Sequence, residues 1–382
     1  MRPRVLVLVL AGGAGSRLEL LTEVRAKPAV PYAGHYRLVD VPLTNALHAG
    51  LEHVWVVEQH HPASLADHLS GGRAWDLDRT TGGLLVLHPH RGGRREGWHG
   101  GTADAVWRQA PLVRELDPAA VVVVSADAVY RLDYDALAQE HLDAGAAVTM
   151  VTTRVDPADA DRYGVVQVED GRVVDYAYKP QHPASDLVAN EVLVLSPEPV
   201  LALLEDLSER DEPGDLGDAL LPELVRRGQV REHRFEGYWR DLGTVEAYWA
   251  AHADLVRAEP PFLPDDPAWP LVTTPGREGP ARLLPGAQVA DSLLSPGTRV
   301  AGTVTGSVLS PRTVVERGAT VRDSVLLPGT VVRAGAVVER AVLDGAEVRP
   351  GARVGGPGAV ALAGRGAVVE EELPAGGRAA GG

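Results

Sequence analysis

Lysine occurs at only two positions in this chain, although the chain has 37 basic residues. Lys27 lies in the stretch RAKPAV and Lys179 in the stretch YKPQ, whereas arginine supplies every other basic side chain. A compact ammonium on a flexible stem can approach a reacting phosphate as a point charge, where a planar guanidinium does not fit the same geometry. Lysine at these two positions therefore marks them as candidate functional positions, although a biased composition could produce part of the pattern.

A glycine-rich turn precedes Lys27. The stretch LAGGAGSRL, residues 10–18, follows an apolar run directly, and such a turn lets backbone amides approach a polyphosphate while the next helix N-terminus adds positive partial charge. Arg17 stands in the turn and Leu18 takes the place of a third glycine, so this is not the GxGxxG of a dinucleotide site. An arginine here suits a leaving pyrophosphate. The absence of GK[ST] excludes a P-loop ATPase, and a purely structural turn is the alternative for this stretch alone.

The turn and RAKPAV together form GGxGxRL…KP, the signature of sugar-1-phosphate nucleotidyltransferases. Three further stretches agree with it: RLVDVPLTN (37–45), GTADAV (101–106) and YWRDLGTVEAYW (238–249). On these motifs the chain resembles the bacterial glucose-1-phosphate adenylyltransferase (ADP-glucose pyrophosphorylase) family over nearly its whole length.

The resemblance implies an enzyme that transfers a nucleotidyl group from ATP to a sugar 1-phosphate, with glucose 1-phosphate as the leading substrate. A phosphate oxygen of the sugar phosphate attacks the α-phosphate in line and expels pyrophosphate, so catalysis rests on positioning and charge neutralisation. The products would be pyrophosphate and ADP-glucose for glycogen or α-glucan synthesis. The family also implies Mg²⁺, a homotetramer and a sugar-phosphate allosteric effector.

The same resemblance assigns roles to matching positions. Arg17 and Lys27 are the implied catalytic residues, Arg17 for the β- and γ-phosphates and Lys27 for charge at the α-phosphate and leaving group. Asp127 and Asp241 match two aspartates that hold Mg²⁺, which prefers oxygen ligands, and Lys179 matches the residue that binds the sugar phosphate. The other implied residues are, for the nucleotide, Ala11, Gly12, Gly13, Gly15, Gln59, Gly101, Thr102 and Asp104 and, for the sugar phosphate, Gly164, Tyr178 and Glu191.

The sugar side departs from the family pattern. Tyr178 stands where the family has the glutamate of EKP, and Ala189 where it has the serine of SMGIYVF. The lost side chains are ones expected to bind glucose hydroxyls, and a buried hydroxyl without a partner costs roughly 1–3 kcal/mol. Glu191 is a candidate replacement for the missing carboxylate from another direction. The phosphate and metal groups are thus retained while the sugar pocket is altered.

An α/β scaffold is predicted to position these groups. Apolar runs typical of parallel strands buried on both faces occupy residues 5–10, 53–58 and 119–127. Helix-like stretches alternate with them, at residues 43–50, 103–116 and 134–145. We predict a Rossmann-like nucleotidyltransferase domain over residues 1–256, with a mixed, mostly parallel sheet and helices on both faces.

Beyond a proline-rich connector at 257–282, the pattern changes to a six-residue rhythm. Aliphatic residues and glycines keep this step, at Val325, Val331, Val337 and Leu343 and at Gly329 and Gly335. The period is typical of a parallel β-helix whose flat sides each bury one aliphatic residue per coil, and a glycine-rich disordered segment is the alternative. We predict a left-handed β-helix over 283–365 and, from the stretch PAGGRAAGG, a disordered tail over 366–382.

Other functions fit the sequence less well. The chain could use another sugar 1-phosphate or NTP, or be a non-catalytic regulatory subunit of ADP-glucose pyrophosphorylase. A regulatory subunit would tolerate loss of Lys27 or a metal aspartate, and neither is lost. An acyltransferase built on the β-helix would commonly use histidine as general base, and no histidine follows His252.

Composition limits the partners and the compartment. The chain has 52 acidic residues and a formal net charge of −15, which opposes binding to nucleic acid or anionic lipid. It has no cysteine, so disulfides and thiolate metal sites are excluded. The apolar start runs into a glycine turn, and no stretch approaches the roughly 18 apolar residues of a membrane span. We therefore expect a cytoplasmic protein without nucleic-acid or membrane partners.

Overall fold

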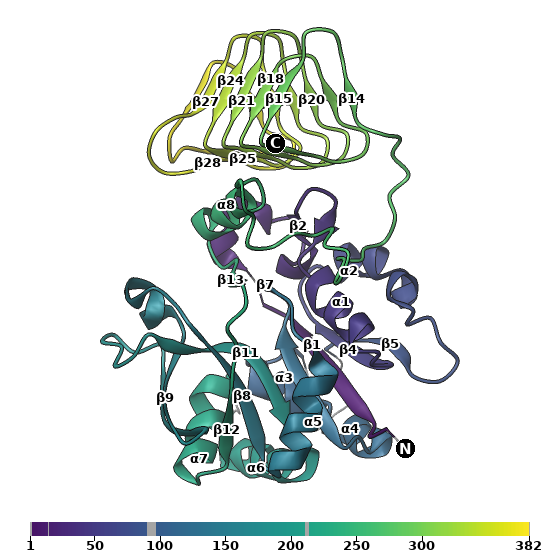
Figure 1. Cartoon of the computed structure of the whole chain (residues 1–382), viewed down its shortest axis with the longest axis vertical. Coiled ribbons are helices and arrows are strands. Elements are labelled where there is room, and N and C mark those ends of the chain that lie inside the picture. Colours follow the sequence, from purple (N-terminus) through teal and green to yellow (C-terminus); the bar gives the residue numbers. More distant parts are fainter. Residues whose placement is uncertain (1, 14, 90–96, 211–213, 382) are drawn as a thin grey trace.

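The computed structural model describes residues 2–13, 15–89, 97–210 and 214–381, which form an α/β domain followed by a β-helix (Figure 1). A nine-stranded mixed sheet is the centre of the α/β domain. Its order is β5 (Gly83–Leu87), β4 (His53–Glu58), β1 (Val5–Ala11), β6 (Ala120–Ser125), β11 (Leu187–Leu195), β8 (Val148–Arg154), β12 (Val230–Arg234), β10 (Arg172–Tyr178) and β9 (Gly164–Glu169). Strands β5, β4, β1 and β6 run parallel, whereas β11 is antiparallel to β6 and β8.

Strand β1 is buried on both faces. Val5, Val7 and Val9 belong to one hydrophobic core, and Leu6 and Leu8 to the core on the other side of the sheet. Because both faces are covered, the strand has no polar alternation, as the apolar runs predicted.

Helices cover both faces of this sheet. The helices of the α/β domain are α1 (Asp40–His48), α2 (Pro62–Leu69), α3 (Thr102–Arg108), α4 (Ala110–Leu116), α5 (Tyr134–Ala144), α6 (Pro197–Arg210), α7 (Leu221–Arg226) and α8 (Val245–Asp254), of which α8 lies away from the sheet beside the β-helix. Shorter helical turns are η1 (Ser16–Leu21), η2 (Lys27–Ala29), η3 (Ser70–Trp75), η4 (Pro157–Arg162) and η5 (Leu216–Leu220). Two small sheets pair β2 (Pro31–Tyr32) with β3 (Tyr36–Arg37), and β7 (Ala128–Tyr130) with β13 (Trp239–Asp241). The predicted helix over 103–116 is two helices that meet at Gln109, because Pro111 in the first turn of α4 favours a new start.

The β-helix consists of three parallel sheets of six strands each. The first contains β14 (Arg282–Leu283), β17 (Arg299–Val300), β20 (Val314–Val315), β23 (Val331–Val332), β26 (Glu347–Val348) and β29 (Val368–Val369). The second contains β15 (Gln288–Ala290), β18 (Thr303–Thr305), β21 (Thr320–Arg322), β24 (Val337–Glu339), β27 (Arg353–Gly355) and β30 (Glu372–Pro374). The third contains β16 (Leu293–Leu294), β19 (Val308–Leu309), β22 (Val325–Leu326), β25 (Ala341–Leu343), β28 (Ala361–Ala363) and β31 (Arg378–Ala379).

The six-residue rhythm is present, but the buried positions of two strands lie one residue later than the sequence suggested. Val332 and Val338 are fully buried, whereas Val331 and Val337 are half-exposed on the outer surface. In each of these strands two valines are adjacent, so the pattern alone could not tell which faces inward.

Strands β29–β31 correct the expectation of a disordered tail over 366–382. They complete a sixth coil that pairs with β26–β28. Val369 and Leu373 are buried in the interior stack, at 4% and 7% exposure. Small residues suggested low complexity, but this coil uses glycine where the chain turns, as at Gly366 and Gly376, both with positive φ.

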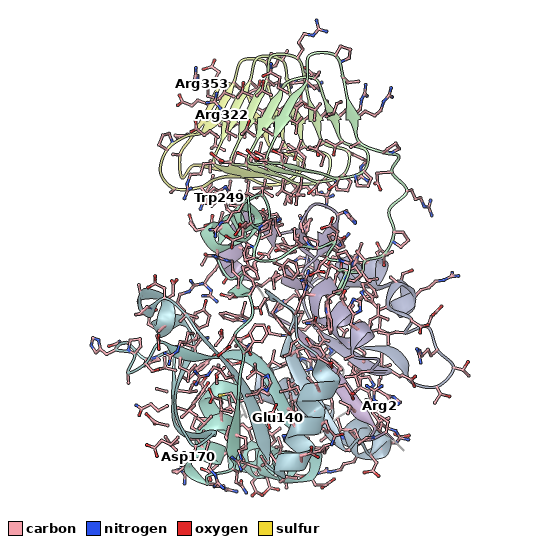
Figure 2. All side chains as sticks on the ribbon, in the orientation of Figure 1. Arg2, Glu140, Asp170, Trp249, Arg322 and Arg353 are labelled. Carbon is pink, nitrogen blue, oxygen red and sulfur yellow. The ribbon has the colours of Figure 1, made fainter. Side chains whose placement is uncertain are left out.

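The connector and α8 join the two parts. In the connector, which has no helix or strand between Arg257 and β14, the carbonyl of Val272 accepts hydrogen bonds from Trp75 and Thr44 of the α/β domain. Trp249 of α8 lies at the junction (Figure 2), where its Nε1 donates to the Asp323 carbonyl at 2.6 Å and the Arg340 guanidinium lies 4.0 Å from its ring centre. Among the described residues, no helix has the length and apolarity to cross a bilayer.

Candidate active site

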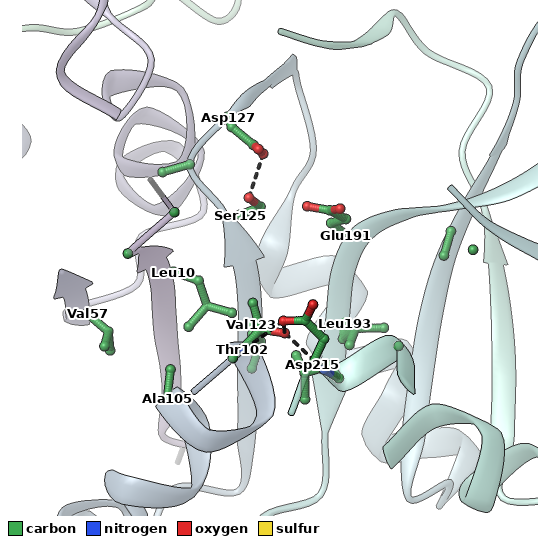
Figure 3. A pocket seen from close by; sticks show the side chains of 18 of the residues that line it. Leu10, Val57, Thr102, Ala105, Val123, Ser125, Asp127, Glu191, Leu193 and Asp215 are labelled. Carbon is green, nitrogen blue, oxygen red and sulfur yellow. Dashed lines mark hydrogen bonds between the residues drawn. The ribbon is translucent and has the colours of Figure 1, made fainter. Parts of the chain in front are cut away.

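A cavity of about 330 Å³ opens at the carboxyl ends of β1 and β6, the place where parallel α/β sheets bind ligands (Figure 3). Twelve of the residues implied by the resemblance line it: Ala11, Gly12, Gly13, Lys27, Gln59, Gly101, Thr102, Asp127, Gly164, Tyr178, Lys179 and Glu191. The remaining four, Gly15, Arg17, Asp104 and Asp241, lie outside this lining.

Lys27 joins the two predicted metal aspartates. Its Nζ, almost fully buried at the start of η2, lies 2.7 Å from Asp127 Oδ2 and 3.8 Å from Asp241 Oδ1. Asp127 follows β6, and Asp241 ends β13, whose antiparallel pairing with β7 sets it opposite Ala128. A short two-stranded ribbon therefore brings the two carboxylates together from distant parts of the sequence.

The charges of this cluster shift one another's pKa. Burial opposes the charge on Lys27, but Asp127 and Asp241 outweigh it and raise the pKa of the ammonium. Burial also opposes the charge on Asp127, yet Lys27 holds the pKa of that carboxyl below its usual range. Burial and the neighbouring Asp127 raise the pKa of Asp241. The two carboxylates thus repel each other, and a cation between them is favourable.

These two aspartates suit a hard divalent cation. Ser125 orients Asp127 by donating a hydrogen bond to Oδ1 at 2.5 Å. Within the described ranges, no three His, Cys, Asp or Glu side chains gather into a metal cage. Mg²⁺ is usually held by one or two carboxylates, several waters and substrate phosphates rather than by an all-protein cage. Asp127 and Asp241 therefore fit this ion, with a substrate supplying other ligands.

The glycine turn brings Arg17 close to Asp241, just outside the cavity lining. Gly15 has φ of 67°, and a Cβ there would lie 3.0 Å from Cβ of Lys27, so only glycine lets the turn pack this closely. Arg17 is exposed on η1. A Cβ on Gly243 would lie 2.7 Å from Asp241 Oδ2 and 3.4 Å from Arg17 Nη2, which places the guanidinium near that carboxylate.

Gln59 links the glycine turn to the loop before α3 through two hydrogen bonds. Its Nε2 donates to the Gly12 carbonyl at 3.2 Å, and its Oε1 accepts from the His99 amide at 2.8 Å. Space is open around Gly13, where an added Cβ would meet nothing within 4 Å. A ligand can therefore approach the backbone of the turn directly.

In the GTADAV stretch, Thr102 faces the cavity and Asp104 does not. Asp104 is fully buried, accepts from the Gly100 amide at 2.9 Å and pairs with Arg108 at 2.9 Å, so it braces the loop instead of facing the cavity. Thr102 lines the cavity and donates to Asp215 from both its amide and its hydroxyl, at 3.0 and 3.2 Å.

The opposite end of the cavity is built around Tyr178. Lys179 Nζ donates to the Tyr178 hydroxyl at 2.7 Å and lies 4.4 Å from its ring centre. The hydroxyl in turn donates to Asp215 Oδ2 at 3.3 Å. Burial opposes the charge on Lys179, but Tyr178 outweighs it and raises the pKa of the ammonium. Lys179 has φ of 46°, a strained conformation that is common at functional sites.

Glu191 faces the cavity because the register of β11 shifts between Ala189 and Leu193. Its side chain is seen beside Ser125 and Asp127 in Figure 3, and its φ of 62° is again unusual for a residue other than glycine. Desolvation by the surrounding protein, followed by the carboxylates of Asp127 and Asp241, raises its pKa to about 7. Gly164 also lies at this end, and a Cβ on it would stand 2.5 Å from the Tyr176 hydroxyl.

Comparisons with known proteins agree with this geometry. A family model described as "Nucleotidyl transferase" matches residues 6–258, and one described as "GlmU-like, C-terminal hexapeptide" matches residues 281–359. Glucose-1-phosphate adenylyltransferase of Thermotoga neapolitana is 39% identical over 82% of this chain and 75% of its own. The enzyme of that name from Thermomicrobium roseum is 42% identical over 77% of this chain and 69% of its own. The chain belongs to the glucose-1-phosphate adenylyltransferase family.

This membership confirms the resemblance drawn from the motifs. The structure adds two residues near the cavity that the sequence analysis did not identify. Asp215 links Thr102 to Tyr178, and Arg162 Nη2 lies 3.2 Å from Asp241 Oδ2. For this member of the adenylyltransferase family, the sequence offered only weak signals for both: an acidic residue just before η5, and an arginine before a Tyr-Gly pair. Neither has a spacing that points to a ligand.

Proposed function

We propose that this protein transfers the adenylyl group of ATP to glucose 1-phosphate, giving ADP-glucose and pyrophosphate. The observation that carries this proposal is a single cavity lined by Lys27, Asp127 and Lys179, with Asp241 Oδ1 3.8 Å from Lys27 Nζ just outside the lining. Cationic groups at two places suit two phosphorylated substrates. The names of the relatives support the choice of ATP and glucose 1-phosphate.

In this proposal the chain's residues position phosphates and neutralise charge. A phosphate oxygen of the sugar phosphate attacks the α-phosphorus, forming one P–O bond while the bond to pyrophosphate breaks, and no covalent enzyme intermediate is needed. Lys27 stabilises negative charge on the α-phosphate, and Arg17 binds the β- and γ-phosphates as pyrophosphate leaves. Lys179 holds the attacking phosphate.

Mg²⁺ is the proposed cofactor. Asp127 and Asp241 would hold it, and the bound ion would neutralise phosphate oxygens and orient the triphosphate. Lys27 contributes a further positive charge beside these two carboxylates.

The proposal has a second form, in which the substrate is a sugar 1-phosphate other than glucose 1-phosphate. Tyr178 occupies the glutamate position, and its hydroxyl is already engaged by Lys179 and Asp215. Asp215 and Glu191 are left as the acceptors that a sugar hydroxyl could meet in this part of the cavity. These contacts favour the second candidate, the same transfer to a different sugar 1-phosphate.

A panel assay separates the two candidates. Purified protein with Mg²⁺ is given each NTP with glucose, glucosamine, galactose or mannose 1-phosphate, and pyrophosphate release is measured. The highest kcat/KM with ATP and glucose 1-phosphate supports ADP-glucose synthesis. A preference for another sugar, reversed toward glucose by Tyr178→Glu, would assign the altered pocket to specificity. Silence with every pair would favour the regulatory subunit.

Assembly and regulation are also proposals. We propose a cytoplasmic homotetramer that responds to a phosphorylated effector. A second cavity of about 240 Å³ between the α/β domain and the β-helix supports the effector, because cationic and titratable side chains line it, namely Arg25, Arg37, Arg312, Arg365, His35 and His68, beside the acids Asp344 and Glu278. Activity that changes with a sugar phosphate but not with inorganic sulfate, and loses this response in Arg365→Ala, would support it.

A further inference from the structure

The segment that joins Arg17 to Lys27 makes two ion pairs with the β-helix. Glu19 pairs with Arg378 in the last coil, and Arg25 pairs with Asp344 after β25. Leu20, between these pairs, packs so tightly on Gly364 that a Cβ there would lie 3.1 Å from the Cβ of Leu20. Both proposed phosphate-binding residues are therefore within two residues of an ion pair to the other domain.

Arg378 of the β-helix fixes the position of the Glu19 carboxylate. Nε and Nη2 of Arg378 each donate to one carboxylate oxygen of Glu19, the second at 3.0 Å. Nη1 donates to the carbonyls of Val360 at 2.9 Å and Gly376 at 3.0 Å, which fixes the guanidinium plane. Hydrogen bonding to Arg378 holds the pKa of Glu19 below its usual range. Such a two-pronged contact constrains direction as well as distance.

Glu19, the residue that pairs with Arg378, has a strained backbone conformation. Glu19 has φ of 51° and ψ of −126°, which interrupts the helical turn of η1. A non-glycine residue in the left-handed half of φ/ψ space persists only when its surroundings determine it. The strained residue stands two positions after Arg17 and is the one that Arg378 grips.

The Arg25 pair is the buried counterpart. Arg25 Nη2 lies 2.7 Å from Asp344 Oδ2, and the two side chains are only 6% and 2% exposed. The segment thus presents one acid, Glu19, and one base, Arg25, to the β-helix, and each is matched there by the opposite charge. A segment docked in any other register would place a buried charge without its partner.

We propose that the β-helix clamps the segment 16–27, and that Arg378 and Asp344 are positioning residues that hold Arg17 and Lys27 toward the cavity. This inference rests on the proposed function, in which Arg17 binds ATP phosphates. Arg378 is the better residue to test, because its pair is partly exposed and its loss leaves no buried charge.

The test compares Arg378→Ala with the charge-exchanged pair Glu19→Arg/Arg378→Glu and with the control Arg349→Ala. Arg349 is also a half-exposed arginine of the β-helix, but its partners Glu347 and Glu370 lie in the same domain. We expect Arg378→Ala to raise KM for ATP about three- to fivefold, the scale of one partly exposed pair, with KM for the sugar phosphate and kcat changed less than twofold. The exchanged pair should recover at least half of the loss, and Arg349→Ala should match the native protein.

Amide hydrogen exchange of residues 16–27 without substrates gives a second readout that does not depend on catalysis. Faster exchange in Arg378→Ala, reversed in the exchanged pair, is expected even if the adenylyl-transfer proposal fails. Unchanged exchange would overturn the clamp. Faster exchange with an unchanged KM for ATP would overturn the positioning role in an active enzyme.

Discussion

We expect acid to destabilise this protein through His252, a ring that folding buries in its neutral form. Its Nε2 accepts a hydrogen bond from the Ala33 amide at 3.2 Å, and its Nδ1 donates to the Tyr248 carbonyl at 2.9 Å. A protonated ring has two donors and no acceptor, so it would leave the Ala33 amide facing a second N–H. Burial lowers the pKa of His252 to about 4.

The sign and size of the effect follow from proton linkage. The folded pKa lies below the unfolded value of 6.5, so the unfolded chain binds the proton more tightly. The stabilisation is complete above pH 6.5 and is lost as pH falls toward 4. Linkage with these two values gives a loss of roughly 2 kcal/mol in the free energy of unfolding between pH 7 and pH 5 for this one residue.

Urea unfolding at pH 7 and pH 5 measures this loss. His252→Gln keeps a donor and an acceptor but does not titrate, so its stability should fall by about 2 kcal/mol less than that of the native protein between these pH values. The exposed His182 provides a matched control, and His182→Gln should keep the native pH dependence. Carboxylates that titrate in the same range contribute equally to all three proteins. An identical fall in His252→Gln and the native protein would refute the argument.

Two further predictions concern the cavity. Lys179→Ala should raise KM for the sugar 1-phosphate about 10- to 100-fold, the scale of a lost hydrogen bond to a charged group, while KM for ATP changes little. Steady-state kinetics with each substrate varied in turn measures both constants. An equal rise in KM for both substrates would contradict the assignment of Lys179 to the sugar phosphate. Gly101→Ala should lower kcat/KM for both substrates at least tenfold, because its Cβ would lie 2.2 Å from the Gly214 carbonyl oxygen and displace Thr102. The control is Gly279→Ala in the connector, where an added Cβ meets nothing within 4 Å, and native kinetics in Gly101→Ala would contradict this packing.

The sequence predicted most of the cavity because its motifs fall at the ends of buried strands. The glycine turn after β1 and Asp127 after β6 end up side by side simply because these strands are parallel neighbours. Asp241 could be paired with Asp127 only through the family resemblance, since β7 and β13 are three-residue strands with no pattern of their own.

At three places the structure differs from the sequence prediction or adds to it. Asp104 was assigned to the nucleotide, but Arg108 one helical turn later and the Gly100 amide engage its carboxylate, and the family motif drew attention away from this local i, i+4 pair. Asp215 reaches the cavity by a tertiary contact with Thr102. The last coil of the β-helix looked disordered because its composition is glycine- and alanine-rich, and its order comes from stacking on the coil before it.

The most direct test of the central claim is to follow the products of ATP and glucose 1-phosphate with Mg²⁺ in the native protein, Lys27→Ala and Asp127→Ala. The account predicts ADP-glucose and pyrophosphate in equal amounts from the native protein, and a loss of at least 100-fold in kcat for each variant while both remain folded by circular dichroism. Native rates in either folded variant, or pyrophosphate without ADP-glucose, would contradict it.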